Sequence, residues 1–86
     1  MSLFNENVLP SKTGKRFGTN AKKTEDLQKI AKKILEIHGV LDVRINTTVF
    51  PVELTIHSKD FSIISISDIQ QKAIDCGFHL VPKFEL

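Results

Sequence analysis

Four side chains of this 86-residue chain could bind a transition metal or act as a nucleophile and base: His38, His57, Cys76 and His79. Imidazole nitrogens and thiolates are the ligands that Zn²⁺ and Cu(I) prefer. Their spacing forms neither a Cys-x-x-Cys nor a His-x-x-x-His pair, and a lone cysteine cannot form an internal disulfide. What these side chains can do therefore depends on the elements that position them.

Two of these residues, Cys76 and His38, are predicted at helical positions with structural roles. Cys76 shares an apolar helical face with Ile69 and Ala73, which is typical of a small buried side chain. His38 falls in the last turn of a predicted helix, where the helix dipole stabilises an imidazolium. His79 follows Cys76 by three residues, but the intervening turn should direct the two side chains apart. We therefore expect no Cys/His nucleophile pair and no enzymatic activity.

The side chains of His57 and His79 are predicted to lie on strands and to point to the open face of a sheet. The expected strand order places one other strand between them, and neighbouring strands lie about 4.8 Å apart. Their backbones would then be roughly twice that distance apart, which is a poor span for chelating one ion. We expect no cofactor, and the residue types leave open only weak binding of Zn or Cu through His57, Cys76 or His79.

A pattern of helix, glycine and strand occurs twice in the chain. Apolar residues recur at helical spacing over 25–38, after which Gly39 supplies the left-handed cap residue. The second copy covers 69–76 and ends at Gly77. Alternation of apolar and polar residues predicts strands over 40–45 and 52–57, and shorter strands are expected over 15–20 and 78–81.

Side chains that can cap a helix stand before both predicted helices. Thr24 is the predicted N-cap of the first helix. Ser67, with Gln70 three residues later, matches a capping box for the second helix, and Ser65 is the alternative cap. These residues fix where each helix is expected to begin.

The order β-α-β-β-α-β predicts an α+β, ferredoxin-like fold, with both helices on one face of a four-stranded antiparallel sheet. The length and the 41% of hydrophobic residues suit one small core. We expect a single domain over 1–86, with an irregular lead-in over 1–14 and the fold itself over 15–81. The expected core residues are Ile30, Ile34, Val43, Leu54, Ile56 and Ile69.

This pattern resembles the heavy-metal-associated (HMA) domain of copper chaperones and of metal-transporting ATPases. The resemblance covers about residues 15–81, and it implies the ferredoxin-like fold and a relation to the binding and transport of soft metals. The residues that carry it are Ile30, Ile34, Ile37, Gly39-Val40, Val43, Ile45, Val52-Glu53-Leu54-Thr55-Ile56, Ile69, Ala73-Ile74 and Gly77-Phe78.

The chain departs from the HMA pattern at the metal-binding loop. Members that carry metal have a Cys-x-x-Cys pair there, and the matching positions in this sequence are Lys23 and Asp26. An ammonium has no free lone pair, and a carboxylate is a hard ligand that suits Mg²⁺ or Ca²⁺. The resemblance therefore implies the fold but no metal ligand, and high-affinity Cu(I) carriage is not expected.

Positive charge is concentrated in the first part of the chain. Residues 1–38 contain eight Lys or Arg and four acids, whereas 39–86 contain four and six. This distribution is typical of a solvated helix face, and a surface for an acidic protein partner or a phosphate is the alternative. No nucleic acid is expected, because the strand aromatics Phe17 and Phe78 are predicted in the core. The predicted partner surface comprises Lys22, Lys23, Lys29, Lys32 and Lys33.

The sequence thus predicts a small, non-enzymatic, HMA-like domain that is related by resemblance to heavy-metal binding. The alternative is a metal-independent protein–protein interaction module that uses the basic first helix or the open sheet face. A regulatory domain for a small ligand ranks third. No apolar run approaches the ~20 residues that span a bilayer, and the first residues do not form a signal peptide. We therefore expect a cytoplasmic protein without a membrane partner.

Overall fold

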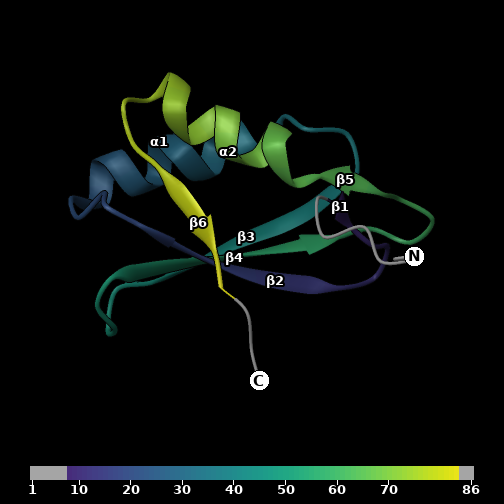
Figure 1. Cartoon of the computed structure of the whole chain (residues 1–86), viewed down its shortest axis with the longest axis horizontal. Coiled ribbons are helices and arrows are strands. Elements are labelled where there is room, and N and C mark those ends of the chain that lie inside the picture. Colours follow the sequence, from purple (N-terminus) through teal and green to yellow (C-terminus); the bar gives the residue numbers. More distant parts are fainter. Residues whose placement is uncertain (1–7, 84–86) are drawn as a thin grey trace.

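The computed structural model describes residues 8–83, which form two helices and six strands (Figure 1). In chain order these elements are β1 (Val8–Leu9), β2 (Gly14–Thr19), α1 (Thr24–Leu35), β3 (Val40–Asn46), β4 (Val52–Ser58), β5 (Ile64–Ser65), α2 (Ile66–Asp75) and β6 (Leu80–Pro82).

Four of the strands form one antiparallel sheet in the order β3-β4-β2-β6. Both helices lie on the same face of this sheet (Figure 1). The central pair, β2 and β4, is in register along its whole length, from Gly14 opposite His57 to Thr19 opposite Val52. The fold is therefore α+β and ferredoxin-like, which confirms the fold class predicted from the order of elements.

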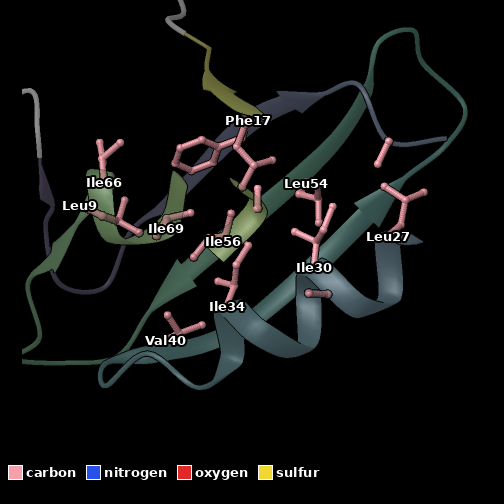
Figure 2. Close-up of a cluster of buried hydrophobic side chains, with 14 of the residues drawn as sticks. Leu9, Phe17, Leu27, Ile30, Ile34, Val40, Leu54, Ile56, Ile66 and Ile69 are labelled. Atoms are coloured by element: carbon pink, nitrogen blue, oxygen red, sulfur yellow. The ribbon is translucent and has the colours of Figure 1, made fainter. Parts of the chain in front are cut away.

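The hydrophobic core lies between the helices and the sheet (Figure 2). In β4, Leu54 and Ile56 point toward the helices and are fully buried, as the alternation of the strand requires. Of the other predicted core residues, Ile30, Ile34 and Ile69 are fully buried and Val43 is half-buried against them. Phe17 of β2 is also fully buried, as predicted.

Helix α1 has different ends from those predicted. Its N-cap is Lys23 in an extended conformation, without a side-chain capping bond, and Thr24 is the first helical residue. The first helical hydrogen bond runs from the N–H of Leu27 to the carbonyl of Lys23. At the other end the chain tightens into bonds between residues three apart, such as Ile37 to Ile34, so the helix stops at Leu35. His38 therefore lies outside the helix, and the prediction that places it in the last turn is wrong.

Helix α2 is capped by Ser65, which confirms the alternative cap. The Ser65 hydroxyl accepts a hydrogen bond from the N–H of Asp68. Gln70 does not complete a capping box, because its side-chain amide donates to the carbonyl of Leu80 instead. The final strand begins at Leu80 and not at 78, so His79 lies in the loop before β6. Pro82 is the last residue of that strand and pairs with Phe17.

A second, two-stranded sheet lies beside the main one. β1 pairs with β5, so that Val8 lies opposite Ser65 and Leu9 opposite Ile64. Residues 1–7 of the predicted irregular lead-in lie outside the described residues; of the rest, Val8 and Leu9 form β1 and Gly14 begins β2, and Leu9 is buried in the core. Within residues 8–83, neither helix is long and apolar enough to cross a membrane.

Candidate functional site

The structure separates the candidate metal ligands into two groups. His57 lies on β4 opposite Gly14, whereas Cys76 is the C-cap of α2 and His79 precedes β6. Strand β2 lies between β4 and β6, as the predicted strand order requires. Within residues 8–83, no three His, Cys, Asp or Glu side chains are grouped so that they could hold a metal ion.

Each of these ligands also has a structural environment of its own. Cys76 is half-buried and packs against the core, in line with its place on the apolar face of α2. His57 donates a hydrogen bond from Nδ1 to Oδ1 of Asp42 over 2.8 Å. Its ring covers Gly14, since a Cβ there would be 2.7 Å from Nε2. The backbone N–H of His79 donates to Oδ1 of Asn20, and its side chain is exposed.

The two positions that match the metal-binding pair of HMA domains lie at the start of α1. Lys23 is exposed at the N-cap and Asp26 is half-buried in the first turn. The helix dipole stabilises a carboxylate at the N-terminal end of a helix. Asp26 therefore has a structural reason to stand at this position that requires no metal.

The open face of the sheet carries a buried carboxylate that the sequence pattern does not reveal. Glu53 lies on β4 on the side away from the helices, yet it is only 7% exposed. Nζ of Lys83 donates a hydrogen bond to Oε2 of Glu53, and Nη1 of Arg16 lies 4.0 Å from Oε1. The hydrogen bond from Lys83, helped by the charges of Lys83 and Arg16, holds the pKa of Glu53 below its ordinary value, although burial acts in the opposite direction.

Three loops lie at the end of the sheet where β2 and β3 finish, at the left of Figure 1, and each contributes a residue to one hollow. They connect β2 to α1, β3 to β4, and α2 to β6. Phe50 in the second of these loops is 83% exposed. The ammonium of Lys22, in the first loop, lies 5.6 Å from the centroid of the Phe50 ring, within the range of a cation–π contact. Lys22 belongs to the predicted partner surface, whereas Phe50 was not predicted.

A hollow of about 360 Å³ lies beside these loops. Gly18 lines it, as does Pro51, which is next to Phe50 in the chain. Val81 also lines it and is 62% exposed. We define the loop-end site as the two residues of the cation–π contact together with the lining of this hollow: Lys22, Phe50, Gly18, Thr19, Asn20, Pro51, His79, Val81 and Lys83.

The five lysines of the predicted partner surface are all exposed, and Lys22 is the one whose contact with Phe50 is described above. Lys29, Lys32 and Lys33 lie further along α1. Oε1 of Glu36, four residues after Lys32, lies 3.7 Å from Nζ of Lys72 in α2. The signal that would have located the loop-end site in the sequence is the apolar run Val49-Phe50-Pro51 between two predicted strands, where a polar turn is usual.

Comparisons of this chain with protein-family models, with curated proteins and with solved structures give no match. The HMA resemblance therefore stays a prediction that rests on the residues quoted for it. The fold itself is established by the strand order and the placement of the helices.

Proposed function

We propose that this chain is a non-enzymatic, metal-independent binding module that recognises a segment of another protein through the loop-end site. The observation that carries the proposal is the exposed Phe50 ring beneath the Lys22 ammonium. Aromatic side chains with a neighbouring cation are typical of residues that dominate the energy of protein interfaces.

The adjoining hollow supports the same function. It can receive one apolar side chain of a partner beside Pro51 and Val81, which both line it. Lys22 and the exposed Lys23 would attract a carboxylate next to that side chain. The expected ligand is therefore a peptide segment with an apolar residue flanked by Asp or Glu.

The metal function implied by the HMA resemblance has less support. Lys23 and Asp26 offer no soft ligand, and no three His, Cys, Asp or Glu side chains of residues 8–83 are grouped so that they could hold a metal ion. HMA-like ancestry and protein binding are compatible, because one fold can host unrelated sites. We therefore place the binding function at the loops and assign no role to a metal.

A selection from a random peptide library displayed on phage tests the proposal with a defined probe. Peptides selected on the wild-type protein should combine acidic and apolar residues. Their affinity should fall about tenfold or more in Phe50→Ala, because loss of a buried aromatic anchor commonly costs at least that much. Lys22→Glu should also weaken binding.

Phe61→Ala is the matched control. Phe61 is 99% exposed, but it lies in the loop between β4 and β5, at the other end of the sheet. Its replacement removes the same aromatic ring without touching the loop-end site, so peptide affinity should not change. Failure to enrich any peptide, or equal affinity of the selected peptides for Phe50→Ala and wild type, would reject the proposal.

A further inference from the structure

We propose that two copies of this chain associate through the outer edge of β3, as a two-fold symmetric antiparallel strand pair centred on Val43. β3 is the end strand in the order β3-β4-β2-β6, and no strand within residues 8–83 pairs with its outer edge. Such an edge presents backbone donors and acceptors to another chain. The interface is separate from the loop-end site.

The two edges of the sheet differ in how well they are protected against pairing. β6 is three residues long and includes Pro82, which has no N–H to donate. β3 is seven residues long and contains no proline. A register shift between Val40 and Asp42 interrupts its pairing with β4, after which the ladder is regular from Asp42 to Asn46. The protection is therefore concentrated on β6, and β3 remains able to pair.

Symmetry and the alternation of side chains restrict the register of such a pair. In an antiparallel pair, residues directly opposite each other lie on the same face of the sheet. On β3, Val43 and Ile45 pair with the core residues Ile56 and Leu54 and so share the helix side, whereas Asp42, Arg44 and Asn46 face away. The two-fold axis must therefore lie between two copies of the same residue. Alternative registers differ by moving the axis to the next residue along β3.

Charge selects one of these registers. With Val43 on the axis, Asp42 of each copy lies opposite Arg44 of the other, so that two unlike pairs form. Moving the axis by one residue places either Asp42 opposite Asp42 or Arg44 opposite Arg44, and like charges directly opposite each other are destabilising. Within one copy Nε of Arg44 already lies 3.8 Å from Oδ2 of Asp42, so the two strands would join these groups into one network of four charges across the axis, and the Arg44 side chain is 75% exposed and free to reach the partner copy.

The same register also covers apolar surface. Ile45 is 36% exposed on the helix side of β3, and the register centred on Val43 brings it opposite Leu41 of the partner copy. Leu41 is 57% exposed but lies at the register shift between Val40 and Asp42, so alternation does not assign it to a face, and charge alone selects the register. Because the axis is perpendicular to the sheet, both helix layers lie on the same side, and the two open faces form one continuous surface.

Light scattering and sedimentation from micromolar to millimolar concentration test this arrangement. The wild-type protein should pass from monomer to dimer as concentration rises. Arg44→Asp and Asp42→Arg should each weaken the dimer about tenfold or more, since each places two like-charged pairs across the axis. The double variant Asp42→Arg/Arg44→Asp restores unlike pairs and should recover association.

A mixture of the two single variants provides an internal control for folding. Arg44→Asp presents two acids and Asp42→Arg presents two arginines, so the mixture should form a heterodimer although each variant alone stays monomeric. Lys23→Asp reverses a charge away from β3 and should dimerise like wild type. A wild-type protein that is monomeric at millimolar concentration, or a mixture without heterodimers, would overturn the proposal.

Discussion

Glu53 shows how a single side chain can escape prediction from strand alternation. It alternates with Leu54 and Val52, which correctly places it on the face away from the helices. Its burial comes instead from Lys83, thirty residues away in sequence, and from Arg16 on the neighbouring strand. A partner so distant in sequence leaves no local pattern, so the ion pair could be found only in the structure.

Glu53→Gln should change how stability depends on pH. The folded state lowers the pKa of Glu53, so the ionised side chain stabilises the fold above the ordinary Glu pKa of about 4.3, and this contribution is lost as pH falls through the lower folded value. We expect Glu53→Gln to be less stable than wild type at pH 7, with a smaller loss of stability on acidification.

Denaturant unfolding between neutral and acidic pH measures this effect. Asp60→Asn, which removes an exposed carboxylate from the loop after β4, should retain the acid dependence of wild type. If Glu53→Gln and wild type lose the same free energy of unfolding between pH 7 and pH 3, then Glu53 does not couple folding to protonation.

Two glycines with positive φ provide a comparison between backbone strain and crowding. Gly39 has φ of +99° and a Cβ there would lie 3.0 Å from Cβ of Ser62, whereas Gly77 has φ of +90° and no atom within 4 Å of such a Cβ. Gly77→Ala should cost about 1–2 kcal/mol for the left-handed conformation. Gly39→Ala should cost more, because contact with Ser62 is added. Equal losses in thermal or denaturant unfolding would exclude crowding at Gly39.

At the scale of elements, the packing of α1 leads to a prediction about adjacent residues. Ile34 is fully buried between the helix and the sheet, whereas Leu35 is 48% exposed. Ile34→Ala should destabilise the protein by about 2–5 kcal/mol, as is usual when a core residue is truncated. Leu35→Ala removes a side chain of the same size and should cost much less. Comparable losses in denaturant unfolding would contradict the position of α1 on the sheet.

Long, periodic elements could be predicted from the sequence, and short ones could not. β4 alternates apolar core residues with polar ones, and α1 buries one helical stripe, so both leave a clear pattern in the sequence. β1 and β5 are two residues long, too short for any period, and form only because they pair with each other. The end of α1 was misplaced because residues 36–38 continue its apolar spacing, although the chain already turns toward Gly39.

The candidate site was predicted only in part for a related reason. The excess of lysine before α1 indicated that Lys22 and Lys23 are exposed cations. The contact of Lys22 with Phe50 joins two loops that are 28 positions apart in sequence, and it depends on how β3 and β4 bring their connection back to the start of α1. Such a contact follows from topology, so the fold had to be known before Phe50 could be assigned.

On the scale of the whole molecule, the two proposed surfaces use different parts of the sheet. The loop-end site lies where the β2–α1, β3–β4 and α2–β6 connections meet, and the proposed dimer uses the outer edge of β3. Helix α2, which carries Cys76 at its end, packs on β6 at the opposite edge of the sheet. A dimer through β3 would therefore keep the two Cys76 thiols far apart.

This arrangement leads to a prediction about metal. Cu(I) binds through thiolates, and each copy offers one half-buried cysteine that the β3 dimer does not pair. We expect no stoichiometric Cu(I) binding against a strong chelator under reducing conditions, for wild type or for Cys76→Ser. Zn²⁺ should bind weakly at most, through imidazole nitrogen.

Competition titration, with oligomeric state followed by light scattering, separates the remaining arrangements. Tight one-to-one Cu(I) binding by a wild-type monomer would show that Cys76 and histidines of one chain can bind the same ion. That result would contradict the structure, in which no three such ligands of residues 8–83 are grouped and His57 lies opposite Gly14. Tight binding only by a dimer, lost in Cys76→Ser, would mean that two α2 helices meet. That geometry is incompatible with pairing through β3, because α2 and β3 occupy opposite edges of the sheet.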